Sequence, residues 1–177
     1  SSQNYFKMLQ STGSEQPAYN ASTGALTFTA SSQTSLQTSL QISLTADFTI
    51  GIKLNPTSNN CVVLGDNTVG GEFFKLTGTN TMKIKINGVS LDLTLDGGNT
   101  WGDDYIVITR QGTRILIWFK GTQQAITGDL SGTVDIDALG VRSTDLNPYD
   151  GDIKEVQIYT STSASLTAKV NERLSTL

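Results

Sequence analysis

The sequence contains no histidine among its 177 residues. It therefore lacks the base of Ser-His-Asp and Cys-His catalysis, the usual proton shuttle near neutral pH, and the commonest ligand of zinc and copper. We expect none of these chemistries in this chain.

Cysteine is almost absent as well, with Cys61 the single example. One cysteine cannot form a disulfide within the chain, and its place in the run Cys61-Val62-Val63-Leu64 indicates a small apolar side chain on a core strand. Because no cation lies near it in the sequence to stabilise a thiolate, we do not expect a reactive thiol.

Charged residues are scarce, at 16% of the chain, and the net charge is -4 at pH 7. Such a balance offers no basic excess for phosphate contacts, so nucleic acid and anionic membranes are not expected partners. The longest apolar run, Ile115 to Phe119, is far shorter than the roughly 18 residues that a membrane span needs. We expect a soluble domain without membrane insertion.

Serine, threonine, asparagine and glutamine are abundant instead, as on β-rich extracellular and virion surfaces. Their hydroxyl and amide groups can hydrogen-bond sugars or a neighbouring subunit. The length suits one domain with one core.

Short runs with alternating apolar residues recur along the chain and predict β-strands joined by turns. Asn87-Gly88 and Gln111-Gly112 are the strongest hairpin signals, since glycine accepts the positive φ of a tight turn. The expected strands are 25–30, 36–44, 48–54, 61–64, 72–76, 82–86, 89–95, 105–110, 114–121, 134–141 and 153–159. This pattern predicts an all-β fold, an antiparallel two-sheet jelly-roll sandwich.

Only the end of the chain has helical spacing. Residues 167–177 predict a short C-terminal helix with Thr167 available as its cap. At the other end, residues 1–22 show no clean period, and we expect an N-terminal arm there, with the sandwich domain spanning 23–177.

Two segments resemble one known superfamily. The first is Tyr105-Ile-Val-Ile-Thr-Arg110, returning after Gln111-Gly112-Thr113 as Arg114 to Gly121, and the second is Asp150-Gly-Asp-Ile-Lys-Glu-Val-Gln-Ile-Tyr159. They are similar to the hairpin and the closing strand of concanavalin A-like, laminin-G-like domains. The resemblance implies the jelly-roll fold, but it leaves function open, because the superfamily contains lectins, glycosidases, adhesive modules and structural parts.

The retaining glucanases of this superfamily carry their acids on one strand as Glu-x-Asp-x-Glu, and this chain has no such strand. Its four glutamates, at 15, 72, 155 and 172, lie far apart in the sequence. The nearest substitute is Asp135-Ile136-Asp137, whose two carboxylates would project from one strand face and simply contact water. We therefore expect no catalytic residues and no enzymatic activity.

The resemblance also implies a possible calcium site on a loop, because many members of the superfamily carry one. No other cofactor is expected. Asp66, Asp103 and Asp145 are the candidate ligands, together with carbonyl oxygens. The acidic stretch 145–155 does not fit the register of an EF-hand loop.

Trp101 lies in a glycine-rich polar loop and has two interpretations. If the indole is exposed, it could stack on a sugar ring while Asn99 and Asp103 hydrogen-bond its hydroxyls. If it folds back, it is a lid on the core. Trp118 alternates with Ile115, Ile117 and Phe119 and is expected on the other face of its sheet, either packed or lining a groove.

These observations favour a non-enzymatic structural or adhesive module of a phage virion, a capsid decoration or tail-associated protein located on the virion surface. Its partners would be other virion subunits or copies of itself, contacted through the arm residues Tyr5, Phe6, Met8 and Leu9. The alternative is a carbohydrate-binding lectin module of a secreted or cell-surface protein, which would bind a cell-surface glycan.

Overall fold

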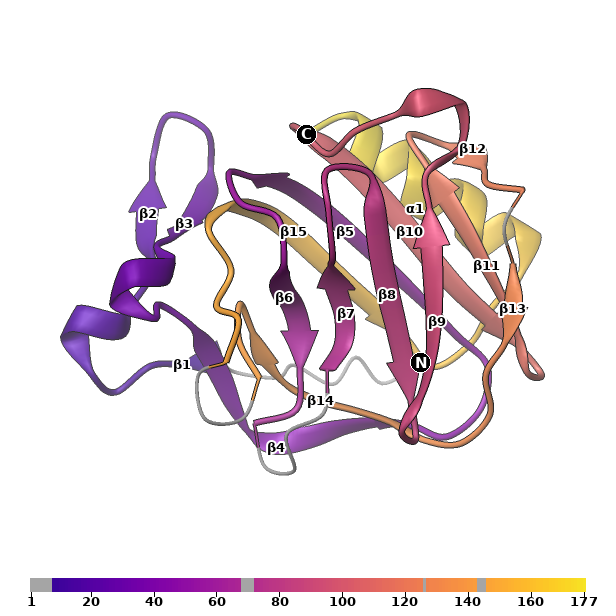
Figure 1. Cartoon of the computed structure of the whole chain (residues 1–177), viewed down its shortest axis with the longest axis horizontal. Coiled ribbons are helices and arrows are strands. Elements are labelled where there is room, and N and C mark those ends of the chain that lie inside the picture. The colour runs from indigo at the N-terminus through magenta and orange to yellow at the C-terminus, as the bar shows by residue number, and fades with distance from the viewer. Residues whose placement is uncertain (1–7, 68–71, 126, 143–145) are drawn as a thin grey trace.

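The protein folds as two antiparallel β-sheets stacked face to face, with one α-helix on the outside (Figure 1). The structure, a computed structural model, describes residues 8–67, 72–125, 127–142 and 146–177. The predicted all-β sandwich with a short C-terminal helix is confirmed.

Sheet A has seven strands, and its outer face looks toward the viewer in Figure 1. In spatial order the strands are β1 (Met8–Leu9), β4 (Leu36–Leu44), β14 (Val134–Leu139), β6 (Cys61–Gly65), β7 (Glu72–Leu76), β8 (Thr81–Ile86) and β9 (Val89–Thr94).

Sheet B has eight strands and lies behind sheet A in the same view. Its path runs β12 (Thr122–Gln123), β11 (Arg114–Phe119), β10 (Asp104–Gln111), β5 (Phe48–Pro56), β15 (Gly151–Tyr159), β3 (Ala25–Phe28) and β2 (Ala18–Asn20), with β13 (Gly128–Asp129) also paired to β11.

Both predicted hairpins form with the expected turns. Asn87 and Gly88 take φ values of 48° and 79° between β8 and β9, and Gly112 takes 62° between β10 and β11. Alternation then sets the register: Met82 opposes Leu93, and Ile84 opposes Leu91, on the core side. The local pattern of each hairpin is therefore enough to turn its apolar side chains inward.

The C-terminal helix α1 (Ala164–Ser175) covers the outer face of sheet B. It begins earlier than predicted, because Ser163 caps it: the Ser163 hydroxyl accepts the Leu166 N–H at 3.1 Å, while Thr167 is a buried residue inside the helix. Gly51 of β5 allows the helix to approach, since a Cβ there would lie 2.4 Å from Cγ1 of Val170.

The described part of the expected N-terminal arm belongs to the edges of both sheets. β1 pairs with β4, with Met8 opposite Thr38, and β2 pairs with β3. Short edge strands carry too little alternation to be seen in the sequence. Residues 8–9 and 18–20 therefore pair with the sheets of the sandwich, and the arm as a separate segment stays a prediction.

Asp150 and Gly151 open the closing strand, as the resemblance implied. The Asp150 carboxylate accepts hydrogen bonds from the Thr57 hydroxyl at 2.7 Å and the Ala30 N–H at 3.0 Å, and these bonds lower its pKa. Gly151 has a φ of 127°, and a Cβ there would lie 2.3 Å from the Asn55 carbonyl oxygen. Only glycine fits this start of β15.

In the described part of the chain, no helix is long and apolar enough to cross a membrane. Cys61 is buried, as predicted, and burial raises the pKa of its thiol. This shift disfavours the thiolate.

Candidate functional site

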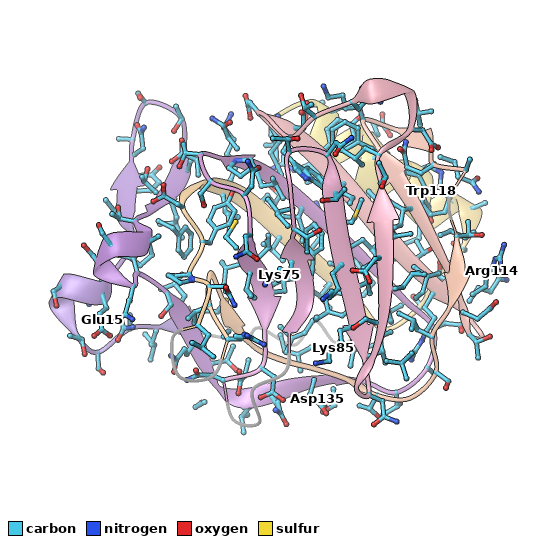
Figure 2. The ribbon with its side chains drawn as sticks, viewed as in Figure 1. Glu15, Lys75, Lys85, Arg114, Trp118 and Asp135 are labelled. Carbon is cyan, nitrogen blue, oxygen red and sulfur yellow. The ribbon has the colours of Figure 1, made fainter. Side chains whose placement is uncertain are left out.

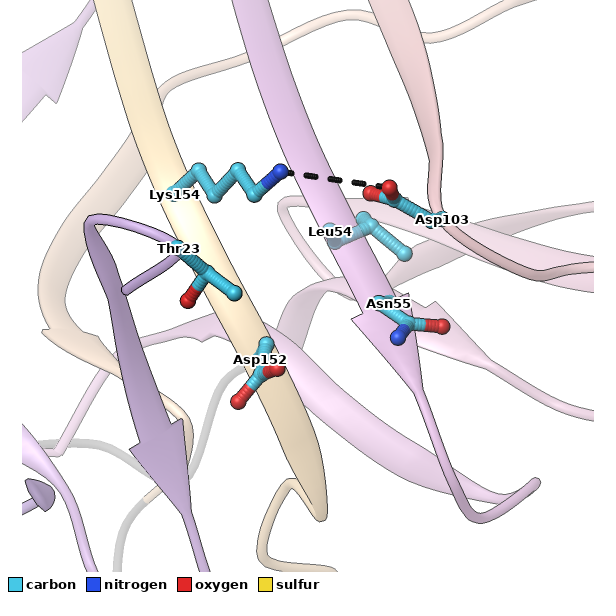
Figure 3. Close-up of a pocket in the computed structure, with 6 residues that line it drawn as sticks. All are labelled: Thr23, Leu54, Asn55, Asp103, Asp152 and Lys154. Carbon is cyan, nitrogen blue, oxygen red and sulfur yellow. Dashed lines mark ion pairs between the residues drawn. The ribbon is translucent and has the colours of Figure 1, made fainter. Parts of the chain in front are cut away.

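A shallow pocket of about 60 Å³ lies on the outer face of sheet B, where the ends of several elements meet (Figure 3). Strands β5 and β15 supply most of it, the turn between β2 and β3 adds one residue, and the segment before β10 adds another. Its lining consists of Thr23, Leu54, Asn55, Asp103, Asp152 and Lys154.

Two lysines hold Asp103 at the rim of this pocket. Lys53 Nζ lies 2.9 Å from the Asp103 carboxylate and also donates to the Asp103 backbone carbonyl at 2.9 Å. Lys154 Nζ approaches the other carboxylate oxygen at 3.9 Å, as Figure 3 shows. Because Lys53 is almost fully buried, its ion pair positions the loop before β10.

The pocket floor is a row of polar side chains across three paired strands. Asp152 of β15 opposes Asn55 of β5 on one side and Thr27 of β3 on the other. The Thr27 hydroxyl donates to the Asp152 carboxylate at 2.6 Å, whereas the Asn55 amide makes no hydrogen bond to any described residue. The Asn55 amide therefore offers both a donor and an acceptor to a ligand.

Alternation along the closing strand accounts for this surface. Ile153 packs into the core, so Asp152 and Lys154 on either side of it turn outward. The pattern alone could have indicated both residues. Thr23 and Asn55, in contrast, have no local signal that marks them as neighbours of Asp152.

Of the three residues predicted to bind a sugar, only Asp103 lines this pocket. Asn99 donates its amide N–H to the Asp96 carbonyl oxygen at 2.7 Å.

Trp101 packs against the core as a lid. Its ring meets Phe119 edge-on, with centroids 5.5 Å apart, and Phe74 at 6.3 Å, and its Nε1–H donates to the Thr81 carbonyl oxygen at 3.3 Å. This geometry matches the second interpretation of Trp101. Trp118 is likewise packed, against the Val107, Val170 and Leu174 cluster beneath α1.

The proposed calcium ligands do not meet in the described residues. Asp103 is held by lysines, Asp66 is buried, and Asp145 lies outside the part that the structure describes. Within that part, no group of three metal-ligating side chains forms. The calcium site stays a prediction.

Asp137 departs from its predicted place. A β-bulge between Ile136 and Ala138 breaks the alternation of β14, so Asp137 is buried and accepts the Asn67 N–H at 2.6 Å. Burial raises the pKa of its carboxyl, and the nearby Asp66 adds to the shift. Asp135 is half-buried and accepts a hydrogen bond from Ser43, so the two carboxylates do not contact water side by side.

The four predicted contact residues of the arm divide into two groups. Tyr5 and Phe6 lie outside the described residues. Met8 packs against the core, while the Leu9 side chain is exposed, at 55% of its full surface.

Comparison of the sequence with models of protein families gives no match, and no curated protein matches it. Solved structures do. The enzymatically active domain of bacteriophage CBA120 tailspike protein 2 superposes with a TM-score of 0.58 at 13% identity, over 97% of this chain and 30% of that one. Domain 4 of AbnA, an extracellular arabinanase from Geobacillus stearothermophilus, gives 0.54 at 16% identity, over 83% and 76%. Mouse laminin α1 domains LG4-5 give 0.53 at 10% identity, over 90% and 46%.

The fold is the concanavalin A-like, laminin-G-like sandwich. A domain of an arabinanase, laminin domains and a tailspike domain all share it with this chain. At identities this low, the likeness establishes the fold alone.

The prediction that the chain is not an enzyme is contradicted. An alginate lyase shares the fold, with a TM-score of 0.50 at 14% identity over 82% of this chain and 83% of that one. The missing Glu-x-Asp-x-Glu strand excludes only one arrangement of acids. Tertiary structure also assembles carboxylates from separate segments, as it does for Asp103 and Asp152 here.

Proposed function

We propose that this chain is a carbohydrate-binding module and that the pocket between β5 and β15 is its binding site. The observation that carries the proposal is the lining of that pocket, where an unbonded amide, two carboxylates and an ammonium group surround one hollow. Adjacent hydroxyls of a sugar ring each donate and accept hydrogen bonds, and such a set can satisfy them. The arabinanase domain supports the proposal, because its structure contains arabinotriose.

The test is oligosaccharide binding measured by titration calorimetry, with arabinotriose and a panel of neutral oligosaccharides as probes. Asn55→Ala should weaken the binding of whichever probe the native protein binds by about tenfold, the effect of one lost hydrogen bond. The melting temperature should change little, because the amide bonds to no described residue.

Asn99→Ala is the matched control, since it removes the same amide from a loop whose side chain does not line the pocket. Its binding should stay at the native level. The pocket assignment fails if Asn99→Ala loses binding while Asn55→Ala keeps it, or if no probe binds the native protein.

The setting that we propose is a virion surface, where the chain would be a capsid decoration or tail-associated protein attached to neighbouring subunits. One observation favours attachment: the outer edge of sheet A exposes Leu9 and Leu40, at 55% and 69%. Exposed apolar side chains beside an edge strand are typical of a contact with another chain. The likeness to a tailspike domain over almost the whole chain supports this setting. Without such a contact, the secreted or cell-surface lectin is the better description.

The double variant Leu9→Ser, Leu40→Ser should leave the circular dichroism spectrum unchanged and abolish co-sedimentation with the purified particle. Val89→Ser is the control, because Val89 is equally exposed, at 58%, on the opposite edge strand of sheet A. Attachment through this edge is refuted if the double variant sediments like the native chain, or if the native chain itself remains free.

A further inference from the structure

The outer face of sheet A carries a group of lysines on two neighbouring strands. Lys75 of β7 lies directly opposite Lys83 of β8, and Lys85 follows two residues later on the same face of β8. Figure 2 shows Lys75 and Lys85 on the face of the sandwich turned toward the viewer, away from α1. Like charges placed directly opposite on paired strands destabilise a sheet, so this arrangement has a cost.

Two of these lysines, Lys75 and Lys85, also lack the acidic partners that other cations of this protein have. Ion pairs hold the basic side chains of the pocket, the β11 hairpin and α1, namely Lys53, Lys154, Lys120, Arg114 and Arg173. Lys75 and Lys85 make no ion pair with a described residue, and Lys83 reaches only the exposed Asp92, at 3.9 Å. A protein with a net charge of -4 therefore gathers unpaired positive charge on one face.

We propose that the outer face of β7 and β8 binds an anionic polysaccharide whose sugars carry carboxylates. Each ammonium group can donate up to three charge-assisted hydrogen bonds to such groups. Lys83 and Lys85 are separated by roughly 6.5 Å along one face of β8, so a flexible chain with an acidic group on each sugar can pair with both. The lysine stems are partly buried, with 28% of the Lys83 side chain exposed, so binding orders them at a reduced entropic cost.

The remaining side chains of this face favour a sugar over a nucleic acid. Thr81 lies on β8 beside the lysines, and Ser90 and Thr94 oppose β8 from β9 on either side of Asp92, so hydroxyls lie next to the ammonium groups. No aromatic side chain points outward among the described residues of β8 and β9, and single-stranded nucleic acid needs such platforms for its bases. This face lies on the opposite sheet from the pocket, so the inference stands apart from the proposed carbohydrate pocket.

The test compares the binding of polygalacturonate, uncharged dextran and single-stranded DNA to the intact chain at low and moderate salt. We expect polygalacturonate to bind with an affinity that falls as the salt concentration rises. Dextran should give no binding signal. The double variant Lys75→Gln, Lys85→Gln should lose about a hundredfold in affinity, about tenfold for each charged hydrogen bond removed.

Lys169→Gln is the matched control, because Lys169 is an exposed lysine on α1, on the far side of the molecule. Equal losses in the control and the double variant would show a general charge effect and overturn the proposal. Tighter binding of DNA than of polygalacturonate would assign the face to nucleic acid instead. If dextran binds as tightly as polygalacturonate, charge does not determine binding and the proposal is contradicted.

Thermal unfolding separates binding from structure. Since Lys75→Gln removes a repulsive pair, its melting temperature should equal or exceed that of the native protein while its affinity falls. A fall in both would mean that Lys75 supports the fold, and the assignment of this face would fail. Variants of the pocket, such as Asn55→Ala, should bind polygalacturonate normally, so the two proposals can fail separately.

Discussion

Replacing Arg110 with methionine is expected to lower the free energy of unfolding by about 3 kcal/mol or more. Arg110 is one of the largest fully buried side chains among the described residues, with 1% of its surface exposed. Its guanidinium donates to three backbone carbonyls: to Gly132 at 2.6 Å, to Leu44 at 3.2 Å, and to Ala46 through both Nε and an NH2 nitrogen.

The size of this effect follows from what methionine leaves behind. Methionine fills a similar volume but donates nothing, so the buried Leu44 carbonyl and the partly buried carbonyls of Ala46 and Gly132 lose this donor. The contact of the guanidinium with the Phe48 ring, 5.0 Å from its centroid, is lost as well. Burial lowers the pKa of Arg110, because desolvation disfavours the charged guanidinium, and this cost offsets part of the stabilisation from its hydrogen bonds. These hydrogen bonds join segments that are far apart in the sequence.

Arg114→Met is the control on the same hairpin. Arg114 is exposed and pairs only with Asp129 at 3.4 Å, so its loss should change the stability by less than about 0.5 kcal/mol. Urea unfolding of both variants gives the comparison. Similar midpoints for the two variants would contradict the structural role of Arg110.

Trp101→Ala is expected to lower the free energy of unfolding by about 3 to 5 kcal/mol, the range for a large aromatic side chain packed on a core. The indole stacks edge-on against Phe74 and Phe119 and ties its loop to the Thr81 carbonyl. Its removal uncovers Phe74 and Phe119 and takes away one of the two hydrogen bonds that the Thr81 carbonyl accepts. Denaturant unfolding followed by circular dichroism measures the change.

Trp101→Phe separates the ring from its hydrogen bond. It keeps most of the edge contacts and should recover more than half of the lost stability. A sugar-stacking role predicts a different result, in which Trp101→Ala unfolds at the native midpoint and fails to bind oligosaccharides. That result would restore the first interpretation of Trp101 and move the binding site to its loop.

The sandwich could be predicted because its signals are local. The Asn87-Gly88 and Gln111-Gly112 turns lie between runs that alternate strictly, and both hairpins form with their apolar residues inward. The predicted cap of α1 was wrong because Ser163 is a stronger capping site one turn earlier. Asp137 was misplaced because a bulge interrupts the period of two on which the prediction rested.

The candidate sites were only partly predictable. Asp103 was selected from the sequence, but its partners Lys53 and Lys154 come from strands that are distant along the chain. Asn55 and Asp152 become neighbours only through the pairing of β5 with β15. The Glu-x-Asp-x-Glu strand is missing from this sequence, but its absence gave no information about the other enzymes that share this fold.

The class of fold, the two central hairpins, the closing strand and the helical end follow from local patterns in the sequence, because turn residues and alternation act within a few positions. The packing of distant segments decided that Arg110 is buried and that β1 forms the edge of sheet A. It also decided that Asp152 lies beside Asn55. These contacts depend on how distant strands pair and pack, and the hydrophobic burial that selects this pairing is a property of the whole chain.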